Sequence, residues 1–132
     1  MKNKIGVMQG RLLPKYKGRY QAHPVGYWQN EFKIAQKYGL DCIEFILDFN
    51  NLQNNPLMQS SGIDEMMVLS ESTGVTVNSI CADYFMYSPF HSKDKAVVEK
   101  NQKILLSLIK NTKQLGLTDI VIPCVDNSSL FK

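Results

Sequence analysis

A junction that occurs three times constrains the fold of this chain more than any other feature. In each copy a helix-like segment stops at a glycine, and a β-branched or apolar run starts within a few residues. Glycine is favoured after the last helical turn because it adopts a left-handed conformation without a Cβ penalty. The junctions read KYGLDCIEFIL, STGVTVNSICA and QLGLTDIVIPCV, with Gly39, Gly74 and Gly116 at the helix ends.

This alternation of helix and strand predicts an α/β fold with a parallel (β/α) repeat of about four strands. The expected strands cover residues 4–8, 42–47, 75–81 and 119–125, and their nearly continuous apolar character fits strands covered on both faces. Alternation alone leaves two architectures open, half of a barrel and a flavodoxin-like doubly wound sheet. The chain has 132 residues, and we treat 1–132 as a single domain.

Three helices are expected between these strands. The clearest covers residues 96–115, with apolar residues on one face and its lysines on a solvated face. Trp28, Phe32 and Ala35 form the stripe of the first helix. A short helix over residues 61–72 opens with Ser61 and Asp64, in the pattern of a capping box.

Composition and charge indicate the broad class of protein. A composition that is 44% hydrophobic and 20% charged is typical of globular proteins. The net charge of +3 does not require a nucleic-acid or membrane partner, and no apolar run approaches the length of a membrane helix. Cys42, Cys81 and Cys124 are expected to be buried free thiols in a cytoplasmic protein.

Polar residues follow each of the four expected strands. In parallel α/β folds the functional groups lie on loops that leave the carboxyl ends of the strands. This rule selects Gln9 and Arg11 after the first strand, Glu44 and Asp48 in and after the second, and a last group after the third and fourth: Asp83, Tyr84 and Asp126. Each could bind a substrate, and each could equally be an ordinary loop residue.

Glu44 is the most informative of these residues, because a carboxylate within CIEFIL would be costly to bury without a partner. We expect it either to bind a substrate hydroxyl or to form a salt bridge with Arg11 across neighbouring strands. Neither alternative is excluded by the sequence.

The loop RLLPKYKGRY carries four cations and two tyrosines. Arg11, Lys15, Lys17 or Arg19 could bind a phosphate, and interleaved aromatic residues also occur where single-stranded nucleic acid is bound. Because the sequence shows no second basic patch, we rank a small phosphorylated ligand above nucleic acid. A simple solvated loop remains the alternative.

Other common sites are absent from the sequence. His23 and His91 are isolated loop histidines, which are usually surface residues, and no zinc-binding spacing is present. There is also no dinucleotide or P-loop motif and no spacing that suggests a Ser-His-Asp triad. The sequence therefore nominates no catalytic residue and no metal ligand.

Several segments resemble the sugar phosphate isomerase/epimerase family in collinear order: GVMQGRLLP, GLDCIEFILD, NPL, SICADYFMYSPF and IVIPCVDNSSL. Members of that family are TIM barrels of the xylose isomerase-like superfamily, which also contains endonuclease IV-type enzymes. The resemblance implies that this chain is the N-terminal half of such a barrel, because a complete one needs about 250 residues.

The resemblance further implies a sugar or sugar-phosphate substrate held by Gln9, Arg11, Glu44, Asp83, Tyr84 and Asp126. In the family the ligands of a divalent metal, Mn or Mg, and the two acid/base carboxylates come mainly from later strands, as a Glu, an Asp, a His and a second Glu. We therefore expect no metal on this chain alone.

A half-barrel would leave two strand edges unpaired and one apolar sheet face open. We expect either that the chain is part of a longer barrel or that two copies form a homodimer through these edges. Two functional alternatives remain: a non-catalytic half-barrel that binds a phosphorylated ligand or partner chain, and an endonuclease IV-like relative that binds nucleic acid.

Overall fold

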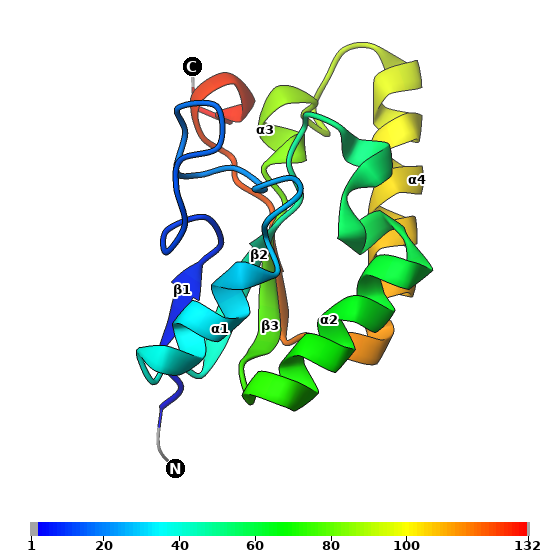
Figure 1. Ribbon diagram of the computed structural model, residues 1–132. Coiled ribbons are helices and arrows are strands. Elements are labelled where there is room, and N and C mark those ends of the chain that lie inside the picture. The colour runs from blue at the N-terminus through cyan, green and yellow to red at the C-terminus, as the bar shows by residue number, and fades with distance from the viewer. Residues whose placement is uncertain (1–2, 132) are drawn as a thin grey trace.

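The computed structural model describes residues 3–131 and contains one parallel sheet of four strands (Figure 1). The strands are β1 (Gly6–Met8), β2 (Cys42–Ile46), β3 (Thr76–Cys81) and β4 (Asp119–Val121), and each pairs with the next along the chain. This consecutive order differs from the flavodoxin-like order, in which the first strand lies inside the sheet. The α/β fold is confirmed and is consistent with half of a TIM barrel.

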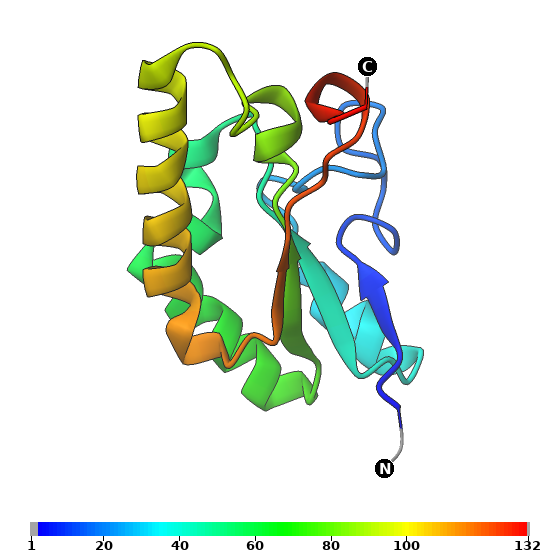
Figure 2. The ribbon, with the colours of Figure 1, turned by 180° about the vertical axis from the view of Figure 1, so that it is seen from behind.

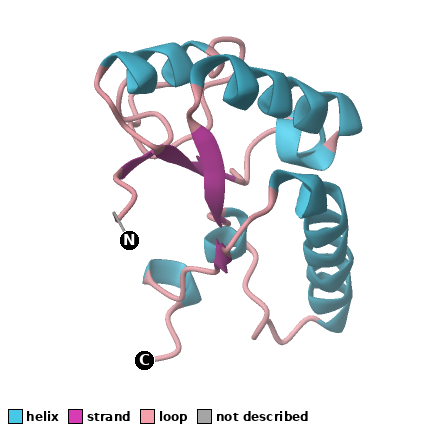
Figure 3. Ribbon diagram, turned by 90° about the horizontal axis from the view of Figure 1, so that it is seen from below, coloured by secondary structure: helices cyan, strands magenta, loops and turns pink. Residues whose placement is uncertain are grey.

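Helices connect the strands, and three of them cover one face of the sheet (Figures 2 and 3). These are α1 (Asn30–Lys37), α2 (Ser60–Thr73) and α4 (Lys95–Thr112), whereas the short α3 (Tyr84–Tyr87) follows β3. Four 3₁₀ turns complete the described elements: η1 (Leu52–Asn54), η2 (Pro56–Met58), η3 (Lys113–Leu115) and η4 (Asp126–Ser128).

The helix ends follow the glycine rule, whereas one helix start does not follow the expected cap. Gly39, Gly74 and Gly116 have φ angles of 70°, 74° and 65°, which confirms the predicted left-handed positions. The capping box at Ser61 is wrong, because α2 already begins at Ser60 and its cap residue, Gln59, makes no side-chain cap bond. The first turn of α2 instead packs closely against Pro56, where a Cβ on Gly62 would collide.

The hydrophobic core lies between the sheet and these helices. In β2 and just beyond it, alternate residues point toward the helices, as the two-residue period of a strand requires. The buried residues that meet there come from every layer of the fold: Phe32 of α1, Ile43, Phe45 and Leu47, Ile63 and Met66 of α2, Val77 and Ile80 of β3, and Leu108 of α4.

Within residues 3–131 the opposite face of the sheet carries no helix, and three of the four residues in its middle row are polar. Met8 pairs with Glu44, Glu44 with Ser79, and Ser79 with Asp119. A register shift between Ile43 and Glu44 creates this alignment, and the Ser79 hydroxyl donates to the Glu44 carboxylate at 2.7 Å. The expectation that this open face would be a large apolar patch is therefore wrong for its middle row.

The cysteines differ from one another more than the sequence suggested. All three are free, but only Cys81 is buried; Cys42 is half-buried and Cys124 is exposed. The expectation of three buried thiols is thus wrong for Cys124, which lies after the last strand. No helix within residues 3–131 has the length and apolar character that crossing a membrane requires.

Candidate functional site

The loop between β1 and α1 is shaped by a buried glutamate of the helix that follows it. The carboxylate of Glu31 accepts hydrogen bonds from the backbone N–H of Gly10 at 2.8 and 2.9 Å and of Leu12 at 3.1 Å. Burial raises the pKa of Glu31, and these backbone bonds partly offset the rise. The carboxylate therefore fixes the first turn after β1.

Gly10 lets the returning chain pass close to this turn. Its φ of 87° is in the left-handed region, and a Cβ there would collide with the Tyr20 carbonyl oxygen and lie 3.0 Å from that of Ala22. The stretch from Tyr20 to Ala22 is thereby held against the end of β1, which positions Gln21 and the preceding Arg19 at the rim of the sheet.

Gln9 ties this loop to the second strand. Its side chain is 1% exposed, and its Oε1 accepts a hydrogen bond from the backbone N–H of Ile46 at 3.0 Å. The same oxygen lies 3.3 Å from Nδ1 of His23. Within residues 3–131 the Nε2 group of Gln9 has no hydrogen-bond partner. Gln9 is therefore a buried connector, and both N–H bonds of its amide nitrogen are free to donate.

His23 is buried rather than exposed, so the expectation of a surface histidine is wrong at this position. Its ring packs against Phe45 and Trp28, with centroids at 5.5 and 6.3 Å. Burial lowers the pKa of His23 to about 4, and the nearby charge of Asp48 only partly offsets this effect. The imidazole is neutral at physiological pH. His91, by contrast, is exposed.

A buried carboxylate and a half-exposed arginine meet at the end of β2. Asp48 is 3% exposed, and its Oδ2 lies 3.1 Å from Nη2 of Arg19. The same oxygen accepts a hydrogen bond from the backbone N–H of His23 at 3.3 Å. One guanidinium nitrogen is thus directed inward, while the rest of the Arg19 head group is available at the surface.

Asp83, which follows β3, is held in the same part of the rim. Gln21 donates to both of its carboxylate oxygens, at 3.0 and 3.3 Å, and the thiol of Cys81 donates to one of them at 3.1 Å. A cavity of about 280 Å³ opens here, lined by Arg19, Gln21, Asp83, Met86 and Tyr87. Its lining combines a cation, an amide and a carboxylate with the side chains of Met86 and Tyr87.

Two of the other expected site residues, Glu44 and Arg11, do not line this cavity, although Arg11 reaches Gln21, which does. Glu44 is on the open face of the sheet, where it accepts the hydrogen bond from Ser79. The guanidinium of Arg11 is 3.5 Å from Oε1 of Gln21 and 6.0 Å from the ring centre of Tyr20. The alternative of an Arg11–Glu44 salt bridge is wrong, since the ion pair found in residues 3–131 joins Arg19 and Asp48.

Tyr84 and Asp126 are also placed differently from one another. Tyr84 is 3% exposed and stacks on Phe49 with ring centres 5.3 Å apart. Asp126 is exposed and begins η4 with a φ of 50°. Of the six expected residues, Asp83 is the one that lines the cavity, and Gln9 is bonded to β2 through the backbone N–H of Ile46.

Sequence reasoning missed Gln21 and Glu31 altogether. Glu31 had no local signal for this role, because Gly10 and Leu12, whose N–H groups it binds, lie 21 and 19 residues earlier in the chain. Gln21 had none, because its partner Asp83 is distant in the sequence. Arg19 and Asp48 were each noted, but nothing local indicated that they would pair.

The carboxylates at this rim do not form a metal site. Among the described residues no three His, Cys, Asp or Glu side chains lie close enough together to hold an ion. Asp48 is paired with Arg19, Asp83 with Gln21, and Glu44 with Ser79. The donor set of this chain by itself therefore does not fit the divalent metal that the family resemblance implies.

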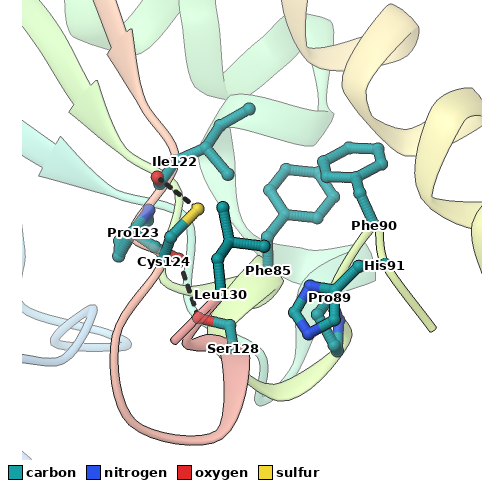
Figure 4. A pocket seen from close by; sticks show the side chains of 9 residues that line it. All are labelled: Phe85, Pro89, Phe90, His91, Ile122, Pro123, Cys124, Ser128 and Leu130. Carbon is teal, nitrogen blue, oxygen red and sulfur yellow. Dashed lines mark hydrogen bonds between the residues drawn. The ribbon is translucent and has the colours of Figure 1, made fainter. Parts of the chain in front are cut away.

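A second cavity, on the β4 side, is almost entirely apolar (Figure 4). It has a volume of about 300 Å³ and lies between the segment after β3 and the segment after β4. Its lining residues are Phe85, Phe90, Ile122 and Leu130, with Pro89, His91, Pro123, Cys124 and Ser128. The Ser128 hydroxyl at its edge is already used, because it donates to the backbone carbonyl of Pro123 at 2.9 Å.

Comparison with known proteins relates the chain to sugar phosphate epimerases. Over 128 residues, 95% of the chain, it is 28% identical to "Putative L-ribulose-5-phosphate 3-epimerase SgbU" of Haemophilus influenzae, of which it covers 41%. The Escherichia coli protein of the same name is 27% identical over 100 residues, 75% of the chain and 35% of that protein. No protein-family profile matches.

The chain thus spans about two fifths of the length of the first of these curated relatives and about a third of the second. Its four parallel strands agree with such a partial match, since half of a barrel would contain four strands. The sequence and the fold together make this chain similar to part of a sugar phosphate epimerase.

Proposed function

We propose that this chain is the substrate-binding half of a sugar phosphate isomerase/epimerase-like barrel. The observation that carries the proposal is the convergence of Arg19, Gln21 and Asp83 on one cavity at the carboxyl ends of the strands. A guanidinium suits a phosphate group because it offers several fixed donors. An amide and a carboxylate beside it can bind sugar hydroxyls.

The similarity to the two named epimerases supports the substrate class. A 3-epimerase of a ribulose phosphate inverts the carbon next to a carbonyl, which requires a proton to leave one face and return to the other. Three of the carboxylates, those of Asp48, Asp83 and Glu44, are already engaged with Arg19, Gln21 and Ser79. We therefore assign the acid/base pair, and the divalent metal expected for the family, to groups outside residues 3–131.

Isothermal titration calorimetry with L-ribulose 5-phosphate tests this assignment. The chain should bind the sugar phosphate, and Arg19→Gln should weaken binding by about tenfold, because a charge-assisted hydrogen bond to phosphate contributes roughly 1.5 kcal/mol. Lys15→Gln is the matched control, since it removes a cation from the same loop without an acidic partner. The affinity of the control variant should change less than twofold.

Two results would contradict the proposal. Equal losses for Arg19→Gln and Lys15→Gln would show that general charge, and not this cavity, attracts the ligand. Epimerisation by the chain alone that depends on Mn²⁺ would show that the metal site and the acid/base groups are present after all. The titrations of the two variants test the first case, and an assay of the epimerised product with and without Mn²⁺ tests the second.

The homodimer expected from the sheet edges is also a proposal. In the described part of the chain, β1 and β4 each pair with one neighbour only, and such edges can pair with another chain. Sedimentation equilibrium tests this, and a concentration-independent monomer would contradict it.

A further inference from the structure

A second basic surface lies far from the rim, along helix α4. The helix contains four lysines and one glutamate, and Figure 1 shows it running beside the segment that links β2 to α2. Lys100, Lys103 and Lys110 follow one another at spacings that bring them to one side of the helix. From the sequence these lysines were expected only to form a solvated helix face, and no second basic patch was expected.

These three lysines line one open hollow of about 480 Å³, together with Gln53, Met58, Ile104, Ser107 and Asn111. Ile104 is buried and Met58 is half-buried, so they form an apolar floor. The remaining lining residues are a hydroxyl and two amides. No carboxylate lines the hollow, and none of the three ammonium groups takes part in an ion pair within residues 3–131.

The wall opposite the helix is held in place by hydrogen bonds. Asn111 of α4 donates through Nδ2 to the backbone carbonyl of Leu57 in η2 at 3.3 Å. Gln59 donates to the carbonyl of Gln53 at 2.8 Å. The distance between the lysines and the β2–α2 segment is thereby set by the fold.

We propose that this hollow binds phosphate groups. Three cations on one side of a helix repel one another, and an anion placed among them relieves that repulsion. The Ser107 hydroxyl and the Gln53 amide supply neutral donors next to the cations, and the absence of a lining carboxylate removes competition for the anion. The site is separate from the Arg19 cavity, so its existence does not depend on the proposed sugar-phosphate function.

Titration of the full chain with inorganic pyrophosphate, followed by backbone amide NMR, tests the proposal. Pyrophosphate should shift the amide signals of residues 100–111 and of the β2–α2 segment. The triple variant K100Q/K103Q/K110Q should weaken this binding by about tenfold or more, because several exposed charge contacts are lost together. The control K33Q/K37Q/K95Q changes the net charge equally on exposed positions and should alter affinity less than twofold.

Binding of a single-stranded oligonucleotide in a second series identifies the source of the phosphate. A small phosphorylated molecule is indicated when pyrophosphate binds at least as tightly as the oligonucleotide. Nucleic acid is indicated when the oligonucleotide binds more tightly, with an affinity that falls steeply between 50 and 200 mM salt. Either result supports a phosphate site when the K100Q/K103Q/K110Q variant loses it.

The proposal is overturned when no ligand shifts these amide signals, or when both triple variants lose affinity equally. Arg19→Gln separates this site from the rim cavity, because pyrophosphate binding at α4 should survive that substitution. All substituted lysines are exposed, so thermal unfolding should confirm that the variants remain folded.

Discussion

The two ends of the sheet are stabilised in different ways. At the β1–β2 end the loops are held by directional bonds to buried polar groups: Glu31 to backbone N–H groups, Gln9 to Ile46, and Asp48 to Arg19. On the β4 side the packing is apolar around a cavity of about 300 Å³. Several large apolar side chains are exposed there: Val121, Val125, Leu130 and Phe131.

This difference has a physical meaning. Directional bonds fix the positions of side chains, which a binding site requires, whereas apolar contacts lower the free energy without fixing geometry as strictly. The polar end is thus suited to hold Arg19 and Gln21 near Asp83. The β4 side has apolar surface that its own chain covers only in part.

Phe85→Ala should give the largest effect and tests the apolar side. The side chain is 1% exposed and packs on Phe90 with ring centres 4.5 Å apart. Removing it should lower the free energy of unfolding by about 3–5 kcal/mol, because apolar burial is lost and the cavity grows. Leu130→Ala, in the same cavity but 64% exposed, should cost less than about 1 kcal/mol. Urea denaturation compares the two, and equal losses would contradict the assignment of Phe85 to the core.

Gly10→Ala should give the next largest effect and tests the polar end. The added Cβ would meet the Tyr20 carbonyl while also straining a φ of 87°, so we expect a loss of about 3 kcal/mol. Gly18→Ala is the matched control. Gly18 has a φ of 79° in the same loop but open space around it, so only backbone strain of about 1 kcal/mol should remain. A similar loss for both variants would show that the close approach of the chain is unimportant.

A pH effect centred on His23 should be smaller. Its pKa in the folded chain, about 4, lies below the unperturbed value of 6.5, so the unfolded chain binds the proton first as pH falls. The contribution of neutral His23 to the free energy of unfolding is present above about pH 6.5 and is lost as the pH falls toward 4. By pH 5 the loss should be about 2 kcal/mol.

The slope of stability against pH can be assigned to His23 by comparing variants between pH 7.5 and pH 5. His23→Gln should lose this component, whereas His91→Gln, at an exposed position, should keep it. The raised pKa of Glu31 acts in the opposite direction, but it is present in both variants and cancels in the comparison. A slope that is unchanged in His23→Gln would contradict the burial argument.

Local rules predicted much of the fold and little of the cavity. Glycine positions and β-branched runs located the strands and helix ends to within a few residues, because these preferences depend on near neighbours in the chain. The cap of α2 was predicted wrongly. The capping-box rule considers only Ser61 and Asp64, whereas the close packing of Gly62 against Pro56 depends on the path of the preceding segment. The rule about strand ends selected Asp83 correctly as a rim residue, but it selected Arg11 and Tyr84 with equal weight.

The sequence by itself determined the parallel (β/α) alternation and the edge of the sheet at which polar groups gather. Only the tertiary structure decided that Arg19 and not Arg11 meets a buried carboxylate, that His23 is enclosed, and that Lys100, Lys103 and Lys110 line one hollow with Gln53. The physical reason is the range of the interactions. Backbone conformation responds to adjacent residues, whereas burial and pairing depend on segments that only folding brings together.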